Sequence, residues 1–306
     1  MLQKIINILY RYPKARLKTF KRFGGYRSYK KMIRLSHLMA SKSAELPPVK
    51  SFEDGLPVYF LTGKKYLYQT LFCIQSLNRV ANAPLRFILV DDGSFDEDLL
   101  AQIRKQLPGA GIVTRQMIEK NLNSILPEQR YPHLNHKRKV YPHIKKLTDI
   151  HTIVPSGWKV VLDSDMLFWN EPTELLNWLQ NPTSPIYMLD CQESYGYSRH
   201  LMEELCGSKI PELLNVGVIG MNSADVNWDK IDRWIGVLEE KEGASYYLEQ
   251  ALTAMLLTGV KTEILPSNTY IVNPDSSMVN NAAGVLHHYV DLSKDDYFTT
   301  AWKKLI

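Results

Sequence analysis

The sequence predicts an α/β fold in which a mainly parallel sheet is flanked by helices. Short apolar runs alternate with segments of helical periodicity between residues 57 and 114, which is typical of β-α-β units. Three of the apolar runs end in polar clusters, and parallel strands bring their carboxyl ends to one edge of a sheet. The chain of 306 residues is 45% hydrophobic, which is sufficient for one large domain or two smaller ones.

The first half of the chain contains the clearest alternation. The apolar run 57–62 ends at Gly63, and the next segment repeats Leu and Ile at helical spacing. A second helix is stopped by the Pro-Gly pair at 108–109. The expected elements are strands at 57–62, 85–90 and 111–114 and helices at 66–80 and 98–107. Residues 121–143 are polar and contain three prolines, so we expect an irregular segment there.

The second half continues with apolar strands and longer helices. The run 159–162 is a buried strand that stops on carboxylates, and 215–221 is an apolar strand with two glycines. The other expected elements are helices at 145–153, 228–240 and 246–257 and strands at 185–189, 264–266, 270–272 and 285–290.

Positive charge is concentrated at the amino-terminal end. Residues 1–50 contain 13 Lys and Arg and one acid, Glu45, whereas the rest of the chain contains 24 basic and 31 acidic residues. Basic and apolar residues are interleaved at helical spacing in this arm, which is typical of a helix that lies on an anionic membrane surface. The pattern predicts that residues 1–45 contact such a surface. A helix packed on the domain with a solvated basic face is the alternative. No RNA-binding motif accompanies the bases, which argues against a nucleic acid partner.

The cysteines and the hydropathy of the chain indicate its compartment. Cys73, Cys191 and Cys206 are too widely spaced for a disulfide framework or a zinc site. No apolar run is long enough to cross a membrane, and no signal peptide is evident. We therefore expect a cytoplasmic protein, peripheral on the inner face of the membrane if its arm binds lipid.

The triplet Asp163-Ser164-Asp165 is the most informative motif. Residues two apart on a strand point the same way, so the two carboxylates are expected side by side. Such a pair repels unless a cation lies between its members, and Mg²⁺ or Mn²⁺ prefers oxygen ligands from protein and from substrate phosphates. The motif predicts a metal-bridged phosphate site for a nucleotide-activated substrate. Taken alone, it also fits a polar turn at the end of a strand.

Two neighbouring strand ends also carry polar groups. Asp91 and Asp92 could accept hydrogen bonds from a nucleobase or ribose, although a simple Asp-Gly turn is the alternative. Thr62 ends the first strand. Lys146 and its neighbour Lys145 lie on the segment before the metal motif and could reach a diphosphate or the acceptor, unless they form a solvated face.

The late segment contains His287 and His288, of which only one can face the site. An imidazole nitrogen beside two carboxylates would complete a metal shell and would favour Mn²⁺ over Mg²⁺. The alternative is a core or surface histidine that binds no metal and makes ordinary hydrogen bonds. Asp190 follows the strand at 185–189 and could orient the donor or the acceptor.

The order of these motifs resembles that of retaining GT-A glycosyltransferases, above all glycosyltransferase family 8, the group of glycogenin and bacterial lipopolysaccharide galactosyltransferases. The resemblance runs from about residue 56 to about residue 303. The segments that carry it are Val58–Thr62, Lys146–Ile150, Trp158–Leu167, Pro172–Leu176, Leu214–Asn222, Glu249-Gln250 and His288-Tyr289. Of these, Pro172–Leu176 resembles the turn that follows the family's metal strand, so the resemblance implies a turn there. Each is weak alone, and the specificity lies in their common order.

The resemblance implies a GT-A catalytic domain at 51–306 after a basic amphipathic arm at 1–50. It implies transfer of a sugar from a nucleotide diphosphate sugar, UDP-linked as in the family, to a glycan or lipid-linked acceptor, with retention. Asp163, Asp165 and His288 would hold Mn²⁺ or Mg²⁺. The residues expected on the nucleotide side are Thr62, Asp91, Asp92, Lys146, Ser164 and Gly217, and the expected catalytic residues are Gln250, Asp190 and Asn215.

An amide such as that of Gln250 is a poor nucleophile, so we prefer same-face attack assisted by the leaving phosphate. The chain departs from the family pattern at Ala251, where the last Asp of "D-Q-D" would stand, and it lacks the "G-x-x-K-P-W" ending. Lys294 or the run 302–304 would replace the phosphate-binding lysine. Two other functions stay open, a nucleotidyltransferase and a non-catalytic GT-A relative that acts as a binding module.

Overall fold

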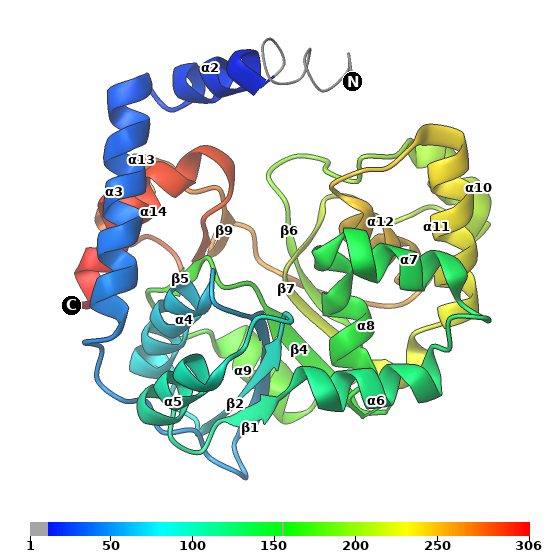
Figure 1. Ribbon diagram of the computed structural model, residues 1–306, viewed down its shortest axis with the longest axis horizontal. Helices are drawn as coiled ribbons and strands as arrows, with labels where there is room; N and C mark the ends of the chain where they lie inside the picture. Colours follow the sequence, from blue (N-terminus) through cyan, green and yellow to red (C-terminus); the bar gives the residue numbers. More distant parts are fainter. Residues whose placement is uncertain (1–11, 155) are drawn as a thin grey trace.

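The computed structural model describes residues 12–154 and 156–306 and contains two sheets surrounded by helices (Figure 1). The larger sheet has the strand order β3-β2-β1-β4-β7-β6-β8. Neighbouring strands are parallel except at β7, which is antiparallel to both β4 and β6. These strands are β1 Leu56–Thr62, β2 Leu85–Asp91, β3 Gly111–Val113, β4 Trp158–Leu162, β6 Ile186–Leu189, β7 Leu214–Asn222 and β8 Glu263–Leu265. The predicted mainly parallel sheet is confirmed.

The reversed direction of β7 brings its first residues to the edge where β4 ends. Leu162 pairs with Val218, and the backbone N–H of Asp163 donates to the carbonyl of Gly217 over 2.9 Å. Side chains at the start of β7 therefore lie beside the carboxylates that follow β4.

A smaller sheet lies next to this edge. It has the order β5-β10-β9, with β5 Met166–Phe168, β9 Tyr270–Val272 and β10 Leu286–His288. β10 is antiparallel to β5, and His288 is opposite Met166. This pairing places the end of β10 one residue from Asp165, although the two segments are far apart in the sequence.

Helices cover both faces of the larger sheet (Figure 1). The helices that follow β1 are α4 Leu67–Val80, α5 Glu97–Gln106, α6 Arg115–Ile125, α7 Pro132–Val140, α8 Lys145–His151, α9 Thr173–Gln180, α10 Arg199–Cys206, α11 Trp228–Glu242, α12 Leu248–Leu256, α13 Ser276–Asn281 and α14 Lys294–Thr299. The expected irregular segment at 121–143 is wrong, because α6 and α7 occupy most of it. Pro132 is the first residue of α7 and Pro142 begins a 3₁₀ turn, positions where a missing N–H costs little. The turn expected at 172–176 is the start of α9.

Alternating residues of the strands fill two separate cores, one on each face of the sheet. Phe87 and Leu89 of β2 belong to the first core, and Ile88 and Val90 belong to the second. Burial on both faces explains why these strands are nearly continuous apolar runs in the sequence.

Two helices precede the sheet, α2 Tyr12–Arg22 and α3 Tyr26–Ser43. α3 packs on α14 and α4, and its buried residues Met32, Ser36, Met39 and Ser43 recur at the spacing of one helix face. α2 turns away from α3 at Gly24-Gly25, where both residues have positive φ (Figure 1). Residues 1–11 of the expected membrane-binding arm lie outside the described residues. None of the helices in the described ranges is both long and apolar enough to cross a membrane.

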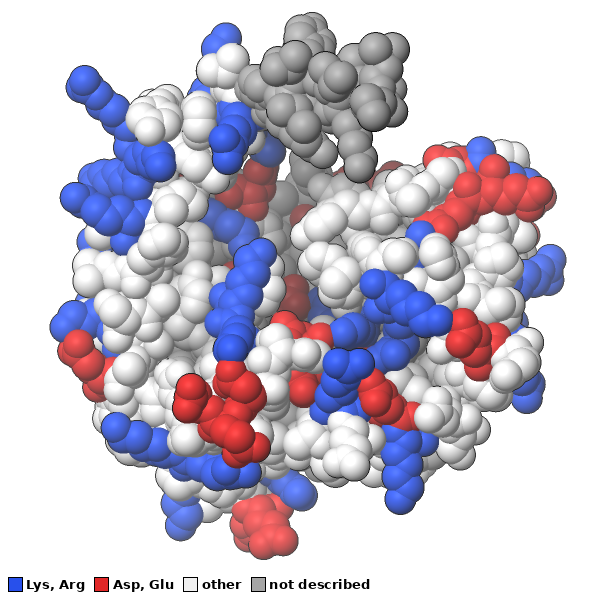
Figure 2. Space-filling model, viewed as in Figure 1, with Lys and Arg blue, Asp and Glu red and all other residues white. Residues whose placement is uncertain are grey.

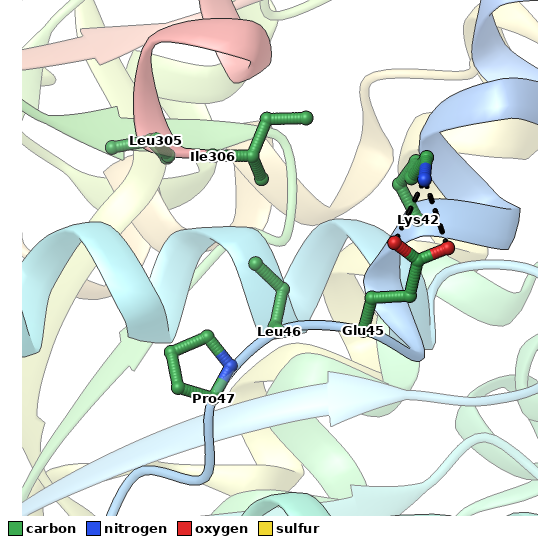
Figure 3. A pocket seen from close by; sticks show the side chains of 6 residues that line it. All are labelled: Lys42, Glu45, Leu46, Pro47, Leu305 and Ile306. Carbon is green, nitrogen blue, oxygen red and sulfur yellow. Dashed lines mark hydrogen bonds and ion pairs between the residues drawn. The ribbon is translucent and has the colours of Figure 1, made fainter.

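The end of α3 also meets the carboxyl-terminal turn. Figure 3 shows the hollow between them, which has a volume of about 180 Å³ and an ion pair between Lys42 and Glu45 on one side. Leu46 and Leu305 are buried at its base. The lining is mostly apolar and contributes no groups to the polar cluster described next.

Candidate active site

Three potential metal ligands converge where the two sheets meet. Asp163 follows β4, Asp165 precedes β5 and His288 ends β10, and one ligand atom from each lies within 4.8 Å of the others. The Nε2 atom of His288 is 3.6 Å from Asp163 Oδ2 and 3.4 Å from Asp165 Oδ1. The Ser164 hydroxyl points elsewhere and shares a hydrogen bond with Thr70 over 2.8 Å.

The orientation of His288 fits a metal ligand. Its Nδ1 atom lies 3.1 Å from Asn215 Oδ1, and the Asn215 amide nitrogen donates to Asp190 Oδ2. This second bond identifies Oδ1 as the atom that faces the imidazole, so Nδ1 donates its proton to it and Nε2 is the nitrogen directed at the two carboxylates. Two carboxylates that face one point repel unless a cation lies between them, and Nε2 is placed to be a third ligand. The donor set of the site therefore fits a divalent cation.

Gly217 makes this approach of the imidazole possible. A Cβ atom at this position would lie 2.4 Å from His288 Nδ1 and 2.8 Å from Asn215 Oδ1. The N–H of Gly217 also donates to Asn215 Oδ1. Gly217 was expected on the nucleotide side, and in the structure its backbone bonds with Asn215 and with the N–H of Asp163, next to the imidazole.

Two lysines flank the carboxylates. Lys146 Nζ is 2.9 Å from Asp163 Oδ1, and Lys294 Nζ is 2.7 Å from Asp165 Oδ2. Burial disfavours the charged form of Asp165, but Lys294 and His288 outweigh burial and hold the pKa of this carboxyl below its usual value. Burial likewise opposes the charge of Lys294, and the attraction of Asp165 raises its pKa. The cluster is thus built from charged groups.

Glu249 is a neighbour of the site that the sequence did not single out as a functional residue. Its carboxylate is buried and lies 3.6 Å from Lys146 Nζ. Burial raises the pKa of Glu249 to about 7, against the attraction of Lys146. Its place beside Gln250 in the motif on α12 was the available signal.

The expected catalytic residues form one polar network next to the cluster. Asp190 Oδ2 accepts hydrogen bonds from the side-chain amides of Asn215 (3.1 Å) and Gln250 (3.2 Å). Asp190 Oδ1 accepts from the N–H of Cys191. Since Asn215 also contacts His288, the network is continuous with the metal-ligand cluster.

The groups at the ends of β1 and β2 are arranged differently. Asp91 Oδ1 accepts three backbone N–H bonds from residues 93–95, so this carboxylate shapes the turn. Asp92 Oδ1 accepts from the N–H of Ser94, and Thr62 is buried with its hydroxyl bonded to Thr70. Roles of these side chains in nucleoside binding stay predictions, and the contacts of Asp91 favour a structural role.

The structure distinguishes alternatives that the sequence left open. His287 faces away from the cluster, where it accepts a hydrogen bond from the Trp169 indole at Nδ1, and burial lowers its pKa to about 4. Trp302 is buried in the core. Lys303 and Lys304 donate to backbone carbonyls at 299 and 280, so Lys294 is the lysine of this region that reaches the cluster.

The cluster is partly open to solvent, since the side chain of Asp163 is 27% exposed and that of Lys294 is 36% exposed. The face is hollowed between the part that carries α3 and α4 and the part that carries α7 (Figure 2). Lys, Arg, Asp and Glu side chains gather around the hollow, which suits a charged ligand.

Solved structures with a similar arrangement identify the fold. The bifunctional glycosyltransferase WbbM aligns with a TM-score of 0.51 and 13% identity, over 85% of this chain and 52% of WbbM. The galactosyltransferase LgtC, in complex with donor and acceptor sugar analogues, aligns with a TM-score of 0.51 and 17% identity, over 81% of this chain and 95% of LgtC. The chain thus spans about half the length of WbbM. No protein-family model and no curated protein sequence matches it. The GT-A fold expected from the motifs is confirmed.

Proposed function

We propose that the chain is a metal-dependent glycosyltransferase that moves a sugar from a nucleotide diphosphate sugar to a glycan or lipid-linked acceptor. The observation that carries this proposal is the cluster of Asp163, Asp165 and His288, flanked by two lysines, in a GT-A fold. The order of motifs favours a UDP-sugar and retention of configuration. The reaction would take place in the cytoplasm.

The metal would be held by two carboxylate oxygens and one imidazole nitrogen, and this mixed donor set favours Mn²⁺ over Mg²⁺. When bound, such an ion neutralises negative charge that develops on a leaving diphosphate. Asn215 supports the site by fixing the tautomer of His288, and such outer contacts raise metal affinity.

The two lysines would have different tasks because their exposure differs. The side chain of Lys146 is 9% exposed and lies between two carboxylates, which suits a fixed counter-ion. The side chain of Lys294 is 36% exposed, so its ammonium group can turn from Asp165 to a diphosphate that enters from solvent. We therefore assign Lys294, rather than Lys303 or Lys304, to the donor phosphates.

The network of Asp190, Asn215 and Gln250 would line the sugar pocket. The amides of Asn215 and Gln250 both donate to Asp190, which fixes the direction of its carboxylate. In same-face attack, the bond from the anomeric carbon to the acceptor oxygen forms while the bond to the diphosphate oxygen breaks. The acceptor's proton passes to the departing phosphate, so Gln250 need not act as a nucleophile. The network then orients hydroxyl groups of the donor or acceptor.

A ligand panel tests the proposal. The thermal midpoint of the protein would be measured with UDP-, GDP- and CDP-sugars, each with and without Mn²⁺, because a bound ligand stabilises the folded state by mass action. We expect the largest rise with a UDP-sugar and Mn²⁺ together, and slow release of UDP in a hydrolysis assay. Release of pyrophosphate from UTP and a sugar 1-phosphate would instead indicate a nucleotidyltransferase. The absence of any nucleotide-dependent shift would refute the proposal.

A further inference from the structure

The helices α2 and α3 carry the most one-sided charge in the chain. Residues 12–43 contain ten Lys and Arg and no Asp or Glu, although the chain beyond residue 50 has a net negative charge. Figure 2 shows basic side chains gathered over these helices at the upper left. A surface of this kind attracts an anionic partner.

The two faces of α3 differ in burial and in charge. Met32 and Met39 are buried against the domain. Arg27, Lys30 and Arg34 recur at helical spacing on the exposed side. Among residues 12–154 and 156–306, the packing of α3 on the domain is therefore complete without its basic face.

α2 presents apolar and basic groups together. Leu17 is 60% exposed and lies between the exposed residues Arg16 and Lys18. Tyr26, at the corner with α3, is 56% exposed and packs edge-on against Phe20. Exposed leucine and tyrosine next to several bases match the interfacial region of a bilayer, where apolar groups enter below the headgroups and bases contact phosphates.

We propose that the exposed face of α2 and α3 docks on an anionic lipid bilayer. This basic face is defined by Arg16, Leu17, Lys18, Lys21, Arg27, Lys30 and Arg34. Charge complementarity favours this partner, and the exposed apolar groups favour a bilayer over a purely polar polyanion. The acidic remainder of the chain would be repelled by the same surface, which orients the molecule.

Docking would also place the active-site cluster near the bilayer. Arg22 at the end of α2 forms an ion pair with Asp291, which lies between His288 and Lys294. α3 packs on α14, whose first residue is Lys294. A lipid-linked acceptor would then approach along the membrane surface; this last step rests on the proposed function, whereas docking itself does not.

The test is sedimentation of the full chain with vesicles of phosphatidylcholine alone or of equimolar phosphatidylcholine and phosphatidylglycerol. The arm variant is Lys18→Glu with Lys21→Glu and Lys30→Glu. Charge changes are preferable to deletion of residues 1–45, because deletion would uncover the core around Met39. The matched control changes three exposed lysines outside the arm to Glu, at Lys105, Lys120 and Lys261.

We expect the wild type and the control variant to bind anionic vesicles at low salt and the arm variant to bind at least tenfold more weakly. Binding should decrease at high salt, since screening weakens exposed charge interactions. Asp163→Asn should bind vesicles like the wild type, so a failure of docking is separable from a failure of the proposed chemistry. Equal loss in both triple variants, or equal binding to neutral vesicles, refutes the proposal. Retention on single-stranded RNA without vesicle binding would assign the face to nucleic acid and would also refute it.

Discussion

Replacement of Gly217 by alanine tests the geometry of the metal site most directly. The added Cβ would lie 2.4 Å from His288 Nδ1 and 2.5 Å from its Cε1. Ordinary contacts of this kind are about 3.5 Å, so the imidazole must move by about 1 Å. The movement breaks the hydrogen bond to Asn215 and displaces Nε2 from the two carboxylates. Because Gly217 has no positive φ, the substitution acts through this contact and not through backbone strain.

The expected effect on Mn²⁺ binding follows from the loss of one ligand's orientation. Disturbing the support of a metal ligand lowers affinity by roughly 10- to 100-fold, or about 1.4 to 2.8 kcal/mol. Calorimetric titration with Mn²⁺ in the presence of UDP would measure it. Overpacking in the core should cost about 1 to 3 kcal/mol in the free energy of unfolding.

Gly220→Ala provides the matched control. It lies on the same strand, and its Cβ would meet Trp178 at 2.5 Å and Ile186 at 2.6 Å, away from the metal ligands. This variant should lose stability and keep its affinity for Mn²⁺. Wild-type affinity in Gly217→Ala, or an equal loss of affinity in both variants, would show that the proposed contact with His288 is irrelevant.

Three further predictions concern the same molecule. Asp165→Asn should reduce metal-dependent hydrolysis of the donor at least 100-fold with an unchanged far-UV spectrum, and full wild-type activity in EDTA would contradict the metal role. Lys294→Met should weaken binding of UDP at least tenfold and binding of uridine hardly at all, and equal losses would place the lysine away from the phosphates. Burial lowers the pKa of His151 to about 3. Below the usual histidine pKa of about 6.5, the unfolded state therefore binds a proton that the folded state does not bind. The free energy of unfolding falls as pH falls through this range. His151→Asn should reduce the stability lost between about pH 6.5 and 4.5, measured by urea unfolding, by about 2 kcal/mol, and unchanged pH dependence would contradict a buried neutral imidazole.

Local sequence patterns predicted most of the fold because its strands are apolar runs with clear ends. The strands β1, β2 and β4 and the helices α4 and α11 begin and end within a few residues of the expected positions. The helices α6 and α7 were missed because the segment 121–143 contains three prolines, which resemble helix breakers. Pro127 in fact lies after the end of α6, and Pro132 occupies the first turn of α7.

The candidate site was predictable only where its groups are neighbours in the sequence. Asp163 and Asp165 are two residues apart, and strand geometry alone places them together. The choice between His287 and His288 depends on the pairing of β10 with β5, which is a long-range contact. The position of Lys294 beside Asp165 depends on the packing of α14 in the same way, and no local pattern contains that information.

The two ends of the reversed strand β7 have different surroundings. Its first residues lie among the polar groups, whereas Asn222 is seven residues further on, or roughly 23 Å away at the usual rise of a strand. A spectroscopic label attached at that distant end would report unfolding of the central sheet without touching the ligand chemistry. One end of β7 can therefore carry a label for unfolding while its other end lines the ligand site. Ligand binding and unfolding can then be measured in the same protein sample.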